Sequence, residues 1–69
     1  MSDKQYTVIY WKGKHISFTK DFYTLSDSKE YFNESVEAFK NIHARNVSVQ
    51  LYDMDSGEVI FDWSSETSS

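Results

Sequence analysis

The sequence predicts an α+β fold, a ββαββ chain in which one helix packs across one face of a four-stranded, mostly antiparallel sheet. Two hairpin patterns, at residues 6–20 and 47–63, each place a glycine between two strand-like runs. The stretch between the hairpins has the apolar spacing of an amphipathic helix. A right-handed crossover from the first hairpin to the second favours the strand order 2-1-3-4.

The first hairpin is predicted to have strands at about residues 6–11 and 15–20. The first run is β-branched and aromatic, and the second alternates apolar with polar side chains. Gly13, between the two runs, can take the positive φ that a tight turn demands. A loop of two, three or four residues fits this pattern, so the register of the hairpin stays open.

One amphipathic helix is predicted over about residues 25–45. Its apolar side chains fall within an arc of roughly 120° at 100° per residue. They are Leu25, Phe32, Val36, Phe39, Ile42 and His43. Thr24, Ser26 or Asp27 can cap the start of the helix, and Asn46 is a natural left-handed stop at its end.

The second hairpin is predicted from strands at about residues 47–52 and 58–63. The turn runs from Asp53 to Gly57, and Gly57 is expected to supply the left-handed residue of a type I turn with a bulge. Residues 64–69 are polar and expected to fray. Residues 1–69 therefore form a single domain, with no linker and no internal repeat.

Alternation of side chains along each strand assigns the two faces of the sheet. The side chains expected beneath the helix are Ile16, Phe18, Val47, Val49, Leu51, Val59, Phe61 and Trp63, and pairing Ile9 with Ile16 adds Ile9 and Trp11. The opposite face is expected to present Tyr6, Val8, Tyr10, His15, Ser17, Gln50, Tyr52 and Ile60.

This second face is the first candidate binding surface, because nothing else in the predicted fold covers it. Tyrosines interleaved with small polar groups are typical of recognition surfaces. The candidate partner-binding residues are Tyr6, Tyr10, His15, Tyr52 and Ile60. Two alternatives stay open: the tyrosines are there because they favour strands, or the face pairs with a second copy of the chain.

Acidic residues dominate the second half of the chain. The net charge is −4, with residues 1–23 contributing +2 and residues 24–69 contributing −6. Four carboxylates, Asp27, Glu30, Glu34 and Glu37, fall within an arc of about 80° on the outer helix face. This acidic ridge either steers the protein onto a basic partner or only keeps the helix solvated. A nucleic acid is a disfavoured partner, since its phosphates would be repelled.

The sequence predicts no catalytic, metal or cofactor site. The run from Asp53 to Gly57 has the wrong glycine spacing for a calcium loop, and His15 and His43 have no cysteine with which to hold zinc. No glycine-rich elbow presents a nucleophile, and no loop is built to cradle phosphate. We therefore expect a protein without enzymatic activity.

The expected function is that of a small protein-binding module that modulates or inhibits a partner. Compact, acidic, cysteine-free domains of this size are typical of small inhibitors, including those that phages direct at host systems, and a nucleic-acid-binding protein is one such target. The alternatives are a self-associating structural protein and a binder of single-stranded nucleic acid that uses Tyr6, Tyr10 and Tyr52 for stacking. The absence of cysteine, of a signal-peptide pattern and of a membrane-spanning run favours a soluble cytoplasmic protein.

Overall fold

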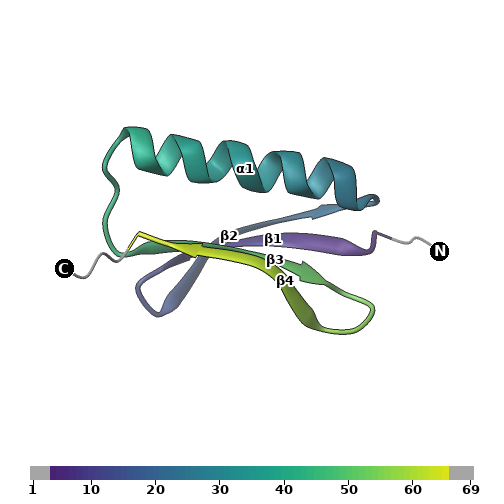
Figure 1. Ribbon diagram of the computed structural model, residues 1–69. Coiled ribbons are helices and arrows are strands. Elements are labelled where there is room, and N and C mark those ends of the chain that lie inside the picture. Colours follow the sequence, from purple (N-terminus) through teal and green to yellow (C-terminus); the bar gives the residue numbers. More distant parts are fainter. Residues whose placement is uncertain (1–3, 66–69) are drawn as a thin grey trace.

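The computed structural model describes residues 4–65. Its elements, in chain order, are β1 (Tyr6–Lys12), β2 (His15–Phe22), α1 (Leu25–Asn41), β3 (Val47–Asp53) and β4 (Glu58–Ser64). All neighbouring strands are antiparallel, in the order β2-β1-β3-β4, and α1 lies across one face of the sheet (Figure 1). This confirms the predicted ββαββ fold and its strand order.

The helix α1 begins where the sequence places it but ends earlier. Thr24 is the N-cap, and its hydroxyl accepts a hydrogen bond of 3.2 Å from the backbone N–H of Asp27. The helix ends at Asn41 rather than near residue 45, because His43 takes a left-handed backbone with φ of 54°. The N–H groups of His43 and Ala44 then donate to carbonyl oxygens of the last helical turn, as in a Schellman motif.

The first hairpin turns through two residues. Lys12 pairs with His15, and Gly13 has a φ of 64°. Further along the hairpin, Trp11 pairs with Ile16 and Tyr10 with Phe18, so Ser17 is an extra residue in β2. Ser17 thus forms a β-bulge, which reverses the alternation of side chains on either side of it.

The second hairpin repeats this plan with a longer turn. Asp53 pairs with Glu58, and Gly57 has a φ of 77°, which confirms the predicted left-handed residue. Farther from the turn, Tyr52 pairs with Val59 and Leu51 with Phe61. Ile60 is therefore an extra residue in β4, placed as Ser17 is in β2.

The two bulges correct the predicted faces of the sheet. Strict alternation assigned Ile16 and Val59 to the helix side, but each bulge puts them on the opposite face from Phe18 and Phe61. The side chains of β1 also point to the opposite faces from those predicted. Its Tyr6, Val8 and Tyr10 pack on the helix side, so the prediction that these residues face outward and that Ile9 and Trp11 lie beneath the helix was wrong.

The core lies between α1 and the two central strands. Its buried hydrophobic residues are Val8, Phe32, Val36, Val49 and Leu51. Two helical serines, Ser28 and Ser35, are also buried, and each hydroxyl donates to a backbone carbonyl of its own helix. Small residues at these two positions let the helix approach the sheet without leaving a polar group unpaired.

The end of the described chain is part of the sheet. β4 extends to Ser64, and the backbone N–H of Ser65 donates to the carbonyl of Val47 at 2.9 Å. The hydroxyl of Ser65 accepts from the N–H of Val47 at 3.1 Å. The fraying expected from residue 64 therefore does not apply to these two serines, and residues 66–69 lie outside the described part of the chain.

Candidate protein interface

The sheet face opposite α1, called here the open face, is not covered by any element within residues 4–65 (Figure 1). The register places on it the side chains of Thr7, Ile9, Trp11, Ile16, Thr19, Asp21, Ser48, Gln50, Tyr52, Val59, Asp62 and Ser64. Figure 1 shows both hairpin turns bending away from α1, toward the open-face side. The bulges account for this bend, because a bulge increases the local twist of its strand.

Two aromatic rings on the open face are tied to one amide. The Oε1 atom of Gln50 accepts hydrogen bonds from the indole Nε1–H of Trp11 at 2.9 Å and from the hydroxyl of Tyr52 at 3.3 Å. Both rings thereby satisfy their polar atom inside the face itself. Trp11 and Tyr52 are thus held in place before any partner arrives, which lowers the entropy lost on binding.

Aliphatic side chains extend this aromatic centre toward both hairpin turns. Ile16, the cross-strand partner of Trp11, is 54% exposed, and Val59, the partner of Tyr52, is 41% exposed. Ile9 lies at the middle of β1 beside Gln50. The outer strands contribute polar side chains to the same face, among them Thr19 and Asp62. An apolar centre with a polar rim is the usual anatomy of a protein interface.

Two of the predicted partner-binding residues, Tyr6 and Tyr10, lie on the covered face instead. The Tyr10 ring packs against Phe39 of α1 at 5.4 Å between centroids, and its hydroxyl is hydrogen-bonded to Ser35. Tyr6 packs against the core cluster. Neither tyrosine is available on the open face, so the stacking platform of Tyr6, Tyr10 and Tyr52 does not exist as one surface.

Tyr31 of α1 belongs to the same covered layer. Its ring is stacked on Tyr10 with 6.1 Å between centroids. Burial, followed by the influence of the adjacent Tyr10 phenol, raises the pKa of Tyr31 to about 12. This hydroxyl therefore stays protonated at neutral pH.

The other three predicted sheet residues have different positions. Tyr52 is on the open face, as expected. His15 is exposed at the turn of the first hairpin, where it pairs with Lys12. Ile60 is the bulge residue of β4 and packs against the core, which removes it from the candidate surface.

The apolar open-face residues that sequence reasoning missed are Ile9, Trp11, Ile16 and Val59. Both faces of the first strand are equally apolar in sequence, so alternation alone cannot choose between them. A usable signal was the similarity of the two hairpins. Thr-Val-Ile-Tyr-Trp at residues 7–11 matches Ser-Val-Gln-Leu-Tyr at residues 48–52 in its pattern of large and small side chains.

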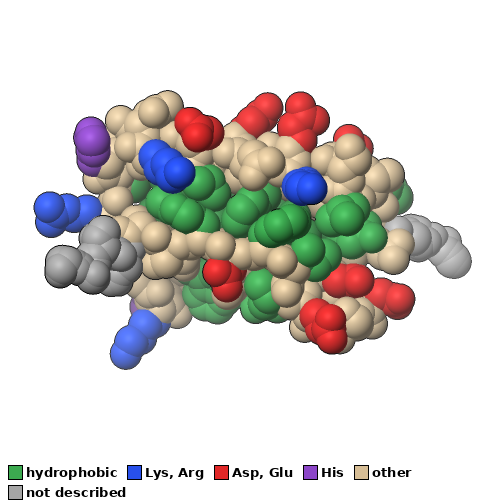
Figure 2. Space-filling view, viewed as in Figure 1, with side chains coloured by type: hydrophobic (Ala, Val, Ile, Leu, Met, Phe, Trp, Pro, Cys, Tyr) green, Lys and Arg blue, Asp and Glu red, His purple; other side chains and the backbone are tan. Residues whose placement is uncertain are grey.

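The acidic ridge is present on the outer side of α1. Asp27, Glu30, Glu34 and Glu37 are all exposed, and Figure 2 shows acidic side chains along the side of the helix that points away from the sheet. The ridge and the open face thus lie on opposite sides of the molecule. A partner seated on the open face does not touch the ridge, which can act on it only through its long-range field.

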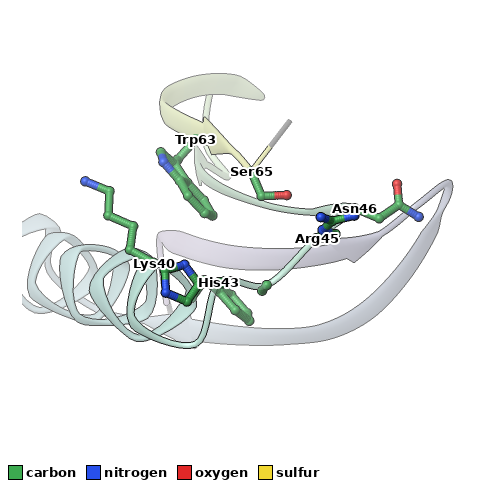
Figure 3. Close-up of a pocket in the computed structure, with 8 residues that line it drawn as sticks. Lys40, His43, Arg45, Asn46, Trp63 and Ser65 are labelled. Carbon is green, nitrogen blue, oxygen red and sulfur yellow. The ribbon is translucent and has the colours of Figure 1, made fainter. Parts of the chain in front are cut away.

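A shallow pocket of about 680 Å³ lies where α1 meets the start of β3 (Figure 3). Its lining includes Lys40, His43, Arg45 and Trp63, and all three basic side chains are exposed. Figure 3 shows Lys40 extending away from Arg45 rather than converging with it. The negative end of the helix dipole also faces this region, which disfavours an anion.

Within residues 4–65, no three histidine or carboxylate side chains come together as metal ligands. Over the same residues, α1 does not combine the length and apolar character needed to cross a membrane.

Comparison with known proteins leaves the geometry as the basis for assigning a function. No family model, no curated protein and no solved structure matches the chain.

Proposed function

We propose that this chain is a non-enzymatic protein-binding module that acts in the cytoplasm and modulates or inhibits a partner by covering part of the partner's surface with the open face. The single observation that carries the proposal is the Trp11–Gln50–Tyr52 arrangement, two aromatic rings fixed by one amide on an uncovered sheet face. Tryptophan and tyrosine are the residues most enriched at energetically dominant interface positions. The absence of cysteine from all 69 residues suits a reducing compartment.

A protein suits this face better than a nucleic acid does. The charged residues of the open face are Asp21 and Asp62, and both are acidic. Lys20, on the neighbouring strand β2, lies over the ring of Phe22, on the side of the sheet that α1 occupies. Most non-specific affinity for nucleic acid comes from cations that neutralise phosphates, and the open face supplies none.

The acidic ridge adds a preference for a basic partner. Four exposed carboxylates along α1 raise the rate of encounter with a positively charged protein, while the open face makes the contact. Replacing Glu30, Glu34 and Glu37 with Lys should therefore slow association and reduce its salt dependence, with little change in dissociation.

The test is capture from the lysate of the native host with tagged protein after nuclease treatment. The Ile16→Asp variant places a charge in the open face, and Ile42→Asp is its matched control, because Ile42 is 68% exposed at the end of α1 and away from that face. We expect one protein to be retained by the wild type and by Ile42→Asp and lost from Ile16→Asp. Equal retention by both variants, with circular dichroism showing both folded, would remove the open face from the proposal.

A further inference from the structure

The two hairpins of the sheet are structural repeats of each other. The central pair, Ile9 and Gln50, lies on an approximate two-fold axis perpendicular to the sheet. Equivalent positions are Thr7 and Ser48, Val8 and Val49, Trp11 and Tyr52, Ile16 and Val59, and Phe18 and Phe61, with a bulge at the same place in each hairpin. A rotation of 180° about this axis therefore leaves the shape of the open face nearly unchanged.

The two hairpin turns carry opposite charge despite their matched backbones. The basic turn contains Lys12, Lys14 and His15, and the acidic turn contains Asp53, Asp55 and Glu58. Because β1 and β3 are antiparallel, these turns lie at opposite ends of the sheet, and the molecule is 43 Å long. Figure 2 shows basic side chains at one lower corner of the molecule and a cluster of acidic side chains at the other.

We propose that a second copy of the chain covers the open face, in a two-fold dimer that sets the basic turn of each copy against the acidic turn of the other. The proposal rests on the proposed function in that both take the open face to be a protein-binding surface, and a second copy and a partner then compete for this face. The two-fold axis runs in the plane between the two sheets, perpendicular to the line that joins the turns. Such an interface is self-complementary, as closed dimers require.

Charge selects this arrangement from its nearest competitor. In the competing dimer, the two-fold axis runs along the line that joins the turns. Because the sheet is itself nearly two-fold symmetric, the apolar side chains of the two open faces fit together equally well in this arrangement. The competing dimer, however, places the two basic turns against each other and the two acidic turns against each other, so the charges repel at both ends. The register places Lys12, His15, Asp53 and Glu58 on the helix side of the sheet, and Lys14 and Asp55 lie in the turns themselves. Because both turns bend toward the open-face side, these charges lie at the ends of the interface, where opposite charges attract within a Debye length of about 8 Å.

The same arrangement pairs the apolar side chains. Trp11 meets Tyr52 of the second copy, and Ile16, beside the basic turn, lies nearer to Val59 of the second copy than to the second copy's own Ile16. The polar residues of the outer strands stay at the rim. Packed sheets lie about 10 Å apart, a spacing that interleaved aromatic and aliphatic side chains fill.

The size of the face sets the expected affinity. Four strands of seven or eight residues, spaced by about 4.8 Å, give a face of roughly 450 Å² in projection, so two faces together bury about 900 Å² before side-chain relief is counted. This is near the lower limit of about 1,000 Å² for specific interfaces. We therefore expect a reversible dimer with a Kd on the order of 10 µM.

Sedimentation over a concentration series tests the dimer and its polarity together. The wild type should change from monomer to dimer. Reversing one turn, by Lys12→Glu with Lys14→Glu or by Asp55→Lys with Glu58→Lys, should raise the Kd by roughly tenfold or more. An equimolar mixture of the two double variants should dimerise again, because opposite turns then meet at both ends. Loss of dimer in Ile16→Asp but not in Ile42→Asp assigns the contact to the open face rather than to the helix side of the molecule.

Cysteine pairs give the polarity directly, because the natural chain contains no cysteine. Under oxidation, Ile16→Cys mixed with Val59→Cys should form the mixed disulfide dimer faster than either variant alone forms its own. Faster linkage of Ile16→Cys to itself would overturn the proposed polarity.

A wild type that stays monomeric to millimolar concentration overturns the dimer, as does a dimer that Ile16→Asp leaves intact. The experiments distinguish failure of the dimer proposal from failure of the proposed function. A monomeric chain whose Ile16→Asp variant still loses a captured protein keeps the binding module and removes only the second copy. A monomeric chain that captures nothing removes both.

Discussion

His43 is the residue at which the backbone of the helix reverses, and it does so at a cost. Its φ of 54° is a left-handed conformation that glycine adopts freely and that a side chain with a Cβ disfavours by about 1–2 kcal/mol. We expect His43→Gly to raise the free energy of unfolding by roughly 0.5–1 kcal/mol, after the greater entropy of glycine in the unfolded chain is subtracted. Urea denaturation measures this, with His43→Ala as the control that removes the imidazole but keeps the strain. A gain of equal size in both variants would assign the effect to the imidazole.

Tyr31 makes stability depend on alkaline pH. Its pKa is about 12 in the folded chain and near 10 in an unfolded one, so the folded state holds the phenolic proton more tightly. The stability that this difference contributes is fully present below pH 10 and is lost as the pH rises from about 10 to 12. We expect wild-type protein to lose more stability than Tyr31→Phe over this range, measured by urea denaturation at pH 9, 10 and 11. Parallel losses in the two proteins would show that other groups carry the alkaline transition.

At the scale of the element, the two turn glycines differ in their surroundings. Both have positive φ, but a Cβ built on Gly13 would lie 3.2 Å from Nδ2 of Asn46, whereas one on Gly57 meets nothing within 4 Å. The backbone N–H of Gly13 also donates to the Asn46 carbonyl at 2.9 Å, which joins the first hairpin to the connection after α1. We expect Gly13→Ala to destabilise the fold by about 1–3 kcal/mol and Gly57→Ala by about 1 kcal/mol. Equal losses in thermal denaturation would mean that the Asn46 contact carries no energy.

The elements themselves could be predicted because each has a local cause. The hairpins follow from β-branched runs around a glycine, and the helix follows from the spacing of Phe32, Val36 and Phe39. The early end of α1 was missed because Asn46 was expected to be the left-handed stop, whereas both His43 and Asn46 have a positive φ and the helix has already ended before His43. The bulges at Ser17 and Ile60 also escaped prediction, because a bulge is fixed by how two strands fit together rather than by the residue it contains.

At the scale of the whole molecule, those two bulges decide which residues form the candidate site. Without them, alternation assigns Ile16 and Val59 to the core. With them, these two side chains join the open face, where the β1–β3 register places Trp11 and Tyr52 and where Gln50 accepts a hydrogen bond from each. The site thus depends on pairing between strands that are distant in the sequence. The exposed position of the four acidic residues on the outer side of α1, which needs only helical spacing, was predicted correctly.

Substitutions in the core beneath α1 and substitutions on the open face should differ in their effect on the free energy of unfolding. Leu51 is 0% exposed between α1 and the sheet, so Leu51→Ala should cost about 2–5 kcal/mol. The whole stability of a domain of 69 residues is only about 3–10 kcal/mol. Val59 lies in β4, next to the strand that contains Leu51, but its side chain is on the open face. Val59→Ala should therefore lower the free energy of unfolding of the monomer by less than about 1 kcal/mol.

Thermal unfolding at several protein concentrations distinguishes the two layers. A dimer that forms only from folded chains raises Tm as the concentration rises. Leu51→Ala should therefore lower Tm at every concentration, whereas Val59→Ala should leave the dilute Tm almost unchanged and flatten its rise with concentration. A large loss of Tm for dilute Val59→Ala would contradict this division, because it would mean that the open face stabilises the monomer itself and is not held ready for a partner.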